Sequence, residues 1–281
     1  MLKSLTVRLN PLFLNDIRCV AAALVFVPFV LMGGGIQFVA QMPLRSVLIL
    51  LGGTVINIGL AESLFLFSLR YIDLSKSYPI SICGYPLVTL ITAYFFLGEQ
   101  VPWITLGGAI LVLIGLYFTA FPAGGFAAGL GKVSSRERIG LALTIGSVIV
   151  YGFGTIFIKV GIEAMDLNVA NFVRFGVIGL LLIPITFKHW RAIGSKDCTW
   201  RSVGMGAANG ALALGLGGWI FLFALNTSGA AMTSVLTSTS PLFLLPLSIF
   251  FLKEKATRKL IVGVIVSVAG IILIFLPKLL G

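Results

Sequence analysis

Charged residues are scarce in this chain of 281 residues: Asp, Glu, Lys and Arg together make up 10% of it, whereas hydrophobic residues make up 58%. A soluble domain carries about 25% charged residues, because it needs them to cover its surface. The composition therefore excludes an ordinary soluble globular domain. The hydrophobic residues form long runs that follow one another along the chain, which indicates a protein whose solvent is lipid.

Histidine and cysteine are also rare. The chain has one histidine, His189, and three cysteines, Cys19, Cys83 and Cys198, with neither the spacing of metal ligands nor that of a disulfide framework. A GxxxxGK[ST] phosphate-binding motif is absent as well. We therefore predict no metal site, no cofactor, no ATP coupling and no enzymatic activity. An integral membrane enzyme acting on lipid-linked substrates stays open as the alternative, and it would need clustered acid, base or metal ligands.

The net charge of +11 comes mostly from basic residues in the short segments between apolar runs. On alternate connections, one side holds fifteen Lys and Arg and the other side two. The fifteen are Lys3, Arg8, Arg70, Lys76, Lys132, Arg136, Arg138, Lys188, Arg191, Lys196, Arg201, Lys253, Lys255, Arg258 and Lys259, and the two are Arg45 and Lys278. Because basic loops stay in the cytoplasm, we predict an N-terminus inside and a C-terminus outside, in the cytoplasmic (inner) membrane of a bacterium. This sorting explains the charge without nucleic acid as a partner.

Apolar runs of roughly twenty residues predict nine membrane spans. They fall near residues 14–33, 46–69, 76–97, 102–121, 138–160, 168–187, 203–225, 230–252 and 258–277. A Gly-rich stretch followed by basic residues, 123–137, reads as a linker. We therefore divide the chain into a first repeat of four spans, residues 1–122, and a second repeat of five spans, residues 138–281.

The two halves repeat the same pattern of prolines, glycines and acidic residues. Five pairs are separated by 155 residues: Pro86 and Pro241, Glu99 and Glu254, Gly108 and Gly263, Gly115 and Gly270, and Pro122 and Pro277. Two earlier pairs, Arg18 with Arg174 and Pro28 with Pro184, are separated by 156. Two five-helix units enter the membrane from opposite sides, since five is odd. We predict an all-α polytopic membrane helix bundle, an inverted repeat of five-helix units in which the first helix of repeat one is missing.

Each repeat has a proline, an apolar run and then an acidic turn, Leu97-Gly98-Glu99 in the first and Leu252-Lys253-Glu254 in the second. This pattern resembles the drug/metabolite transporter superfamily, in its EamA-like branch. The resemblance runs from about residue 14 to 277, and it implies a ten-helix bundle that moves small metabolites or toxic compounds. The chain departs from that pattern in its missing first helix.

The predicted function is that of a secondary transporter, a permease that moves a small organic metabolite or drug-like solute by alternating access, with proton coupling as an option. The membrane enzyme and a non-transporting truncated homologue remain as alternatives. The expected partners are the solute, the lipid bilayer and protons, and the oligomeric state is left open.

Glu62 is the sharpest candidate for a transport role. It lies inside an apolar span with no cation three or four residues away. Placing a carboxylate at membrane depth costs a few kcal/mol or more of free energy, unless the group is protonated, paired or exposed to water. We predict that Glu62 couples protons or binds a cationic part of the solute. A protonated carboxyl that only bonds a neighbouring helix is the structural alternative.

Two hydroxyl-rich segments, 75–86 and 233–241, precede matching prolines in the two repeats. A proline inside a helix frees a carbonyl, which a hydroxyl, water or solute has to satisfy in the membrane. We predict that these segments line the solute pathway, although hydroxyls also pack helices closely. The predicted pathway residues are Asn57, Glu62, Ser77, Tyr78, Ser81, Tyr85, Tyr151, Thr155, Trp219, Thr233, Thr237 and Ser238, with Pro86 and Pro241 as helix-kink prolines.

The remaining charged residues in or near the spans receive other roles. Lys76 and Lys159 lie near span ends and are secondary candidates, because the resemblance implies that some carriers of the superfamily bind anionic solutes with such cations. Arg18 and Arg174 are expected to anchor helix ends. Glu99 and, in the second repeat, Glu254 are expected to cap or turn helices.

Overall fold

The computed structural model describes residues 5–6, 9–32, 42–120, 134–163, 165–194, 198–240 and 258–280. In these ranges the regular structure is helical, with no strand. The α-helices are α2 (Pro11–Met32), α4 (Leu44–Thr54), α5 (Glu62–Ser68), α6 (Leu74–Thr92), α7 (Trp103–Ala120), α9 (Ser135–Ile162), α10 (Leu167–Arg191), α11 (Trp200–Asn209), α12 (Gly217–Ser228), α13 (Ala230–Thr237) and α15 (Arg258–Leu280). Three π-helical turns continue α4, α6 and α11: η1 (Val55–Ala61), η2 (Ala93–Leu97) and η3 (Gly210–Leu216).

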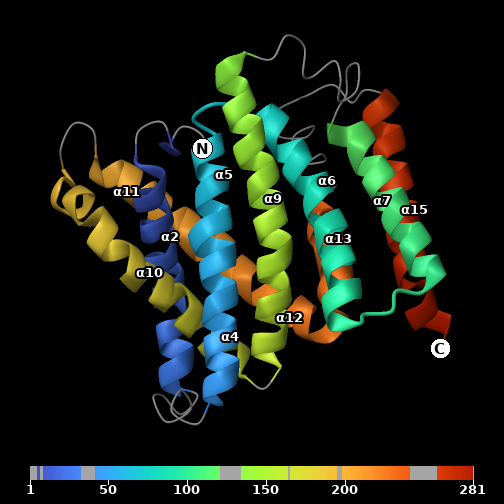
Figure 1. Cartoon of the computed structure of the whole chain (residues 1–281), viewed down its shortest axis with the longest axis horizontal. Helices are drawn as coiled ribbons and strands as arrows, with labels where there is room; N and C mark the ends of the chain where they lie inside the picture. The colour runs from blue at the N-terminus through green and yellow to red at the C-terminus, as the bar shows by residue number, and fades with distance from the viewer. Residues whose placement is uncertain are drawn as a thin grey trace.

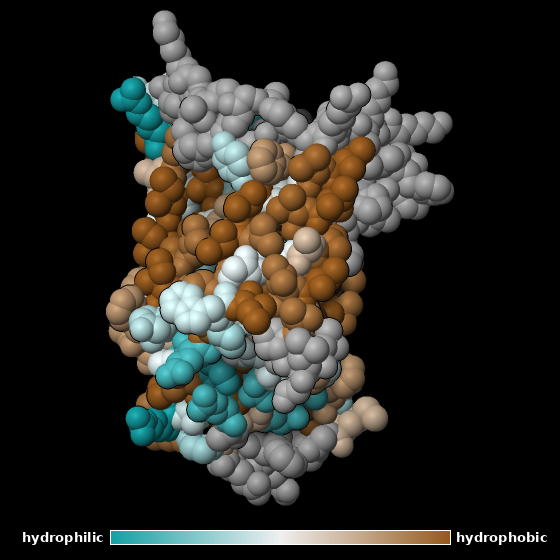
Figure 2. Space-filling view, turned by 90° about the vertical axis from the view of Figure 1, so that its right-hand side faces the viewer, coloured by the Kyte–Doolittle hydropathy of each residue, from teal (hydrophilic) through white to brown (hydrophobic). Residues whose placement is uncertain are grey.

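The predicted all-α membrane bundle is confirmed. Within the described residues, six helical stretches are long and apolar enough to cross a membrane: Pro11–Met32, Leu44–Ser68, Lys76–Leu97, Ser135–Ile162, Leu167–Arg191 and Trp200–Ser228. Two shorter apolar helices, Trp103–Phe118 and Ile261–Leu276, accompany them. Of the predicted eighth span, 230–252, the described part ends at residue 240. Figure 2 shows a broad hydrophobic band across one face, as lipid contact requires.

The helices run alternately up and down, so α2 begins and α15 ends at opposite ends of the bundle (Figure 1). Basic residues gather at one end of the bundle, where α5 and α10 end and α6, α9 and α11 begin; this is the upper end in Figure 1. They are Arg70, Lys76, Arg136, Arg138, Lys188, Arg191 and Arg201. We call this the basic end. The opposite end carries Arg45 together with Glu99, Glu163 and Asp166.

Helices α7 and α15 cross through glycines of both repeats. A Cβ built on Gly108 would lie 2.7 Å from the Gly270 carbonyl oxygen, and one on Gly115 would lie 2.5 Å from the Gly263 carbonyl oxygen. Such distances leave no room for a side chain, so glycine is required at this crossing. The order of the contacts is reversed along the two helices, which makes the helices antiparallel.

The α7–α15 contacts follow the sequence repeat. Gly108 contacts Gly270, which is the counterpart of Gly115, and Gly115 contacts Gly263, which is the counterpart of Gly108. Ser267 Oγ lies 3.5 Å from the carbonyl oxygen of Val112, which is 155 residues earlier and is therefore the counterpart of Ser267. A two-fold axis between inverted repeats places equivalent residues against each other in this way. The π-helical turns η1 and η3 are also 155 residues apart. These contacts support the inverted repeat, and the arrangement of four plus five helices stays a prediction.

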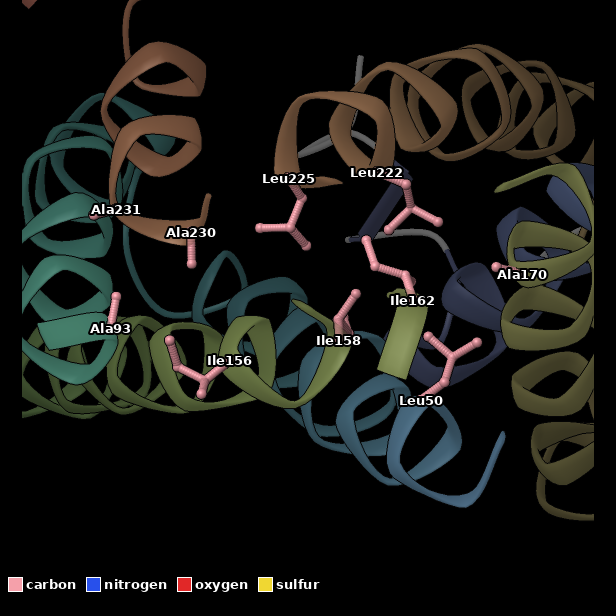
Figure 3. Packing of buried hydrophobic residues seen from close by; sticks show 10 residues of the cluster. All are labelled: Leu50, Ala93, Ile156, Ile158, Ile162, Ala170, Leu222, Leu225, Ala230 and Ala231. Atoms are coloured by element: carbon pink, nitrogen blue, oxygen red, sulfur yellow. The ribbon is translucent and has the colours of Figure 1, made fainter. Parts of the chain in front are cut away.

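An apolar cluster packs at the end opposite the basic end. It contains Leu50, Ala93, Ile156, Ile158, Ile162, Ala170, Leu222, Leu225, Ala230 and Ala231. These side chains come from α4, η2, α9, α10, α12 and α13, and therefore from both halves of the chain. Figure 3 shows Leu222, Leu225, Ile158 and Ile162 pointing toward one another. We call this group the apolar plug.

Candidate substrate cavity

A cavity of about 350 Å³ lies between the two halves of the chain. Its walls come from η1, α5, α6, α9, α10, η3, α12 and the last residues of the α13 segment. Eight predicted pathway residues line it: Asn57, Glu62, Tyr78, Ser81, Tyr85, Tyr151, Thr237 and Ser238. The volume lies at the lower end of the range for small-molecule sites.

Glu62 is not isolated, because it forms an ion pair with Arg18 of α2. Both side chains are buried, and Glu62 also accepts a hydrogen bond from the Tyr151 hydroxyl. The expectation that Arg18 anchors a helix end is therefore wrong: it lies two turns inside α2 and faces the bundle. Residues three or four positions from Glu62 reveal only cations of its own helix, whereas Arg18 is 44 residues away in the sequence. The guanidinium and the phenol both donate to the Glu62 carboxylate, so this buried group has partners inside the bundle.

An amide and two hydroxyls extend this polar group across the repeats. Asn57 Nδ2 donates to the Tyr151 carbonyl and to Thr155 Oγ1, both at 3.3 Å. The hydroxyls of Tyr85 and Thr155 lie 3.2 Å apart. A Cβ on Gly154 would come within 2.9 Å of the Asn57 side chain, so this glycine allows η1 and α9 to approach closely. Thr155 thus lies behind the wall and holds Asn57 and Tyr85 in place.

Arg174 of α10 also lines the cavity, and its assignment as a helix-end anchor is wrong. Its exposed fraction is 3%. Its Nη1 donates to Asn171 Oδ1 at 3.4 Å, while Nε has no hydrogen-bond partner among the described residues. Its guanidinium lies 4.8 Å from the centre of the Phe175 ring. Among the described residues, no carboxylate forms an ion pair with Arg174.

Asn15 and Asp16 of α2 are fully buried polar residues that were not predicted from the sequence. Asn15 Nδ2 donates to the Ile58 carbonyl at 2.8 Å and to Ser63 Oγ at 3.2 Å. Asp16 accepts hydrogen bonds from Trp190 Nε1 at 2.7 Å and from the Thr186 hydroxyl. One available signal was the repeated pair Asn-x-x-Arg, which occurs at 15–18 and again at 171–174. A helix places residues three apart on one face, so each pair points into the bundle together.

Several predicted pathway residues lie away from the cavity wall. Ser77 is buried and its hydroxyl lies 2.9 Å from that of Thr144. The Trp219 ring stacks on Phe223, with 5.6 Å between the ring centres. Thr233 is buried, and its hydroxyl makes no hydrogen bond to the described residues. These three positions serve helix packing in this structure.

The two secondary lysines and the kink proline Pro86 also lie outside the cavity wall. Lys76 Nζ is 2.6 Å from Glu137, and Lys159 Nζ is 3.7 Å from Glu163. Both cations therefore have carboxylate partners. Pro86 lies inside α6, which continues through it, while Pro241 falls outside the described residues.

Glu99 caps a helix of the other half of the chain. Its carboxylate accepts hydrogen bonds from the backbone N–H groups of Ala230 and Ala231, at 2.8 and 3.0 Å. The negative charge also suits the positive end of the α13 dipole. A second cavity of about 240 Å³ lies beside this contact, at the end opposite the basic end. The capping role expected for Glu99 is present, and it joins two segments 131 residues apart; Glu254 lies outside the described residues.

This geometry defines a class of protein: a polytopic α-helical membrane protein with a cavity between its two halves that is lined by buried charged side chains. The model of the EamA-like transporter family matches residues 1–121 and 138–276. The chain therefore belongs to the EamA-like transporter family, and the resemblance to the drug/metabolite transporters is confirmed. It is a membrane transporter.

Two relatives carry transporter names, and a solved structure has a similar fold. The chain is 24% identical over 230 residues to an "Uncharacterized transporter" of Archaeoglobus fulgidus, a match that covers 80% of this chain and 77% of that protein. It is 32% identical over 114 residues to an "Uncharacterized transporter" of Clostridium kluyveri, covering 41% of this chain and 36% of that protein. A crystal structure with 15% identity matches with a TM-score of 0.73 over 100% of this chain and 93% of the other, which shows the fold alone.

Proposed function

We propose that this protein is a secondary transporter that carries a small organic solute across the membrane by alternating access. The observation that carries the proposal is a cavity of about 350 Å³ between the two halves of the chain, which is lined by the buried side chains of Arg174 and Glu62, the latter paired with the buried Arg18. Buried ionisable groups are expensive at membrane depth, so their usual place is a pathway for solute or ions.

The apolar plug supplies one gate of this cycle. It packs between the cavity and the end opposite the basic end. Its members belong to both halves, so rocking of one half against the other separates them and exposes the cavity on that side. We assign the basic end to the cytoplasm by the positive-inside rule. The N-terminus then lies inside and the C-terminus outside, in an inner membrane, with repeats at 1–122 and 138–281 joined by the linker 123–137.

Glu62 is our candidate for proton coupling, together with Arg18 and Tyr151. Protonation of the Glu62 carboxyl removes the charge that balances Arg18 and takes one acceptor away from the pair. The geometry of η1 and α5 against α2 then changes, because a buried cation without its partner is unstable. The Glu62 carboxylate already pairs with Arg18 and accepts a hydrogen bond from Tyr151. In this proposal Glu62 therefore does not bind a cationic group of the solute.

Reconstitution of the purified chain into proteoliposomes tests the function. Uptake of a panel of small metabolites should exceed that of empty liposomes and should saturate. A Tyr151→Phe variant removes the hydroxyl donor to Glu62 and should shift the pH dependence of uptake, while Tyr94→Phe, on an exposed position, should not. A folded protein that moves none of the panel under any proton gradient or in solute exchange would contradict the proposed function.

Coupling itself is tested with Glu62→Gln. This variant should lose gradient-driven uptake and retain exchange of solute between the two sides, because exchange needs no net proton movement. Uptake at the parental rate with an unchanged pH profile would show that the carboxyl is structural.

A further inference from the structure

The two repeats carry the same buried Asn-x-x-Arg pair and differ in what faces the arginine. At a shift of 156 residues, Asn15 and Arg18 correspond to Asn171 and Arg174. The runs 65–69, Phe-Leu-Phe-Ser-Leu, and 221–225, Phe-Leu-Phe-Ala-Leu, follow the same shift. Glu62 then corresponds to Gly218, and at the shift of 155 to Gly217. Either way, the second repeat has glycine where the first has the carboxylate that neutralises its arginine.

Gly218 lies beside the helix that carries Arg174. A Cβ on Gly218 would lie 3.6 Å from Asn171 Oδ1 and 2.9 Å from the Phe175 ring. Gly217, Gly218 and Arg174 all line the cavity. Both glycines therefore face the same cavity as a buried guanidinium whose Nε makes no hydrogen bond to the described residues, and the Phe175 ring lies over Gly218.

We propose that the cavity takes an organic monocarboxylate, whose carboxylate pairs with Arg174 beside Gly217 and Gly218. The solute carboxylate thus plays the part in the second repeat that Glu62 plays in the first. This inference rests on the proposed transport function and names its substrate class. A guanidinium pairs with a carboxylate through charge-assisted hydrogen bonds that can be bidentate.

The charge balance of the cavity selects a single negative charge. Arg18 and Glu62 neutralise each other, so the described lining retains the one positive charge of Arg174. Arg174 would repel the ammonium group of an amine. The ammonium group of a zwitterion would need a carboxylate partner in the wall, and the Glu62 carboxylate already pairs with Arg18. The rest of the wall is mostly apolar and includes Phe65, Phe175 and Phe221, which suits an apolar or aromatic body.

Binding to the purified full chain in detergent tests the substrate class separately from transport. The probes share a phenylethyl body and differ in the head group: 3-phenylpropionate, its amide, 3-phenylpropylamine and 2-phenylethyl phosphate. We expect 3-phenylpropionate to bind at least tenfold more tightly than each of the other three, by calorimetry or ligand-induced thermal stabilisation. Equal or tighter binding of the amide, amine or phosphate, or binding by none of the four, overturns the inference.

Two sets of variants tie the binding to Arg174. Arg174→Gln should abolish the preference for the carboxylate over the amide, and Arg174→Lys should keep part of it, whereas Arg191→Gln, at the end of α10, should leave it unchanged. A preference that survives in a folded Arg174→Gln variant overturns the inference. Since this variant can fail to fold, the second set leaves Arg174 in place.

Gly218→Glu adds the missing carboxylate, and Gly218→Gln has the same size without the charge. Both have to displace the Phe175 ring, so that cost cancels in the comparison. The Glu variant should bind 3-phenylpropionate at least tenfold more weakly than the Gln variant and should melt at a higher temperature, because its carboxylate pairs with Arg174. Equal affinities overturn the inference. Failure of the metabolite panel in proteoliposomes, with carboxylate binding intact, would instead refute the transport function.

Discussion

The buried pair of Arg18 and Glu62 gives the sharpest stability prediction. The exposed fractions are 4% for Arg18 and 9% for Glu62, so water does not screen the charges. Glu62→Gln preserves an acceptor for the Tyr151 hydroxyl and leaves the guanidinium without its counter-charge. Removal of one partner of a buried pair costs about 3–5 kcal/mol. At about 2–4 °C per kcal/mol, the melting temperature should fall by roughly 6–20 °C.

A second substitution should reverse most of this loss. Arg18→Met in the Glu62→Gln background removes the buried cation while retaining an unbranched side chain of similar length. Replacing a buried pair by uncharged residues is often neutral, so the double variant should recover at least about 2 kcal/mol relative to Glu62→Gln. The two changes should therefore be strongly non-additive.

Thermal unfolding of the purified variants in detergent, followed by tryptophan fluorescence, measures both effects. Glu163→Gln is the control, because its carboxylate is exposed and 3.7 Å from Lys159, and such pairs contribute about 0–1 kcal/mol. A Glu62→Gln variant whose melting temperature lies within about 2 °C of the parent's, a shift that corresponds to about 1 kcal/mol or less, would refute the reasoning. So would a double variant that melts below the single one.

Three further predictions concern the helix crossing, the cap and the topology. Gly108→Ala should destabilise the bundle by about 1–3 kcal/mol, because its Cβ meets backbone at 2.7 Å, whereas Gly107→Ala, with open space around it, should be neutral or stabilising in the same melting assay. Glu99→Ala should cost about 0.5–2 kcal/mol through the loss of two N-terminal hydrogen bonds of α13, and equal melting of Glu99→Ala and the parent would contradict the capping role. A fluorescent protein fused to the C-terminus should stay dark and an alkaline phosphatase fusion should be active, and the reverse pattern would contradict the proposed orientation.

The sequence alone was sufficient for the membrane class, the position of most spans and the family. Span positions follow from long apolar runs, which need no tertiary partner to be recognised. Eight cavity-lining residues, Glu62 and Tyr85 among them, were also found from the sequence. They were found because a polar residue in an apolar span is conspicuous wherever it points.

The tertiary structure alone decided which residues meet. In a membrane span nearly every face is apolar, so periodicity does not reveal the face that packs inward. The sequence therefore predicts a helix-end anchor at Arg18, whereas the approach of α2 to α5 pairs Arg18 with Glu62. The same holds for Glu99, whose partners on α13 are 131 residues away. Helix rotation and close packing at glycines set these contacts, and neither is written in the composition or spacing of a single span.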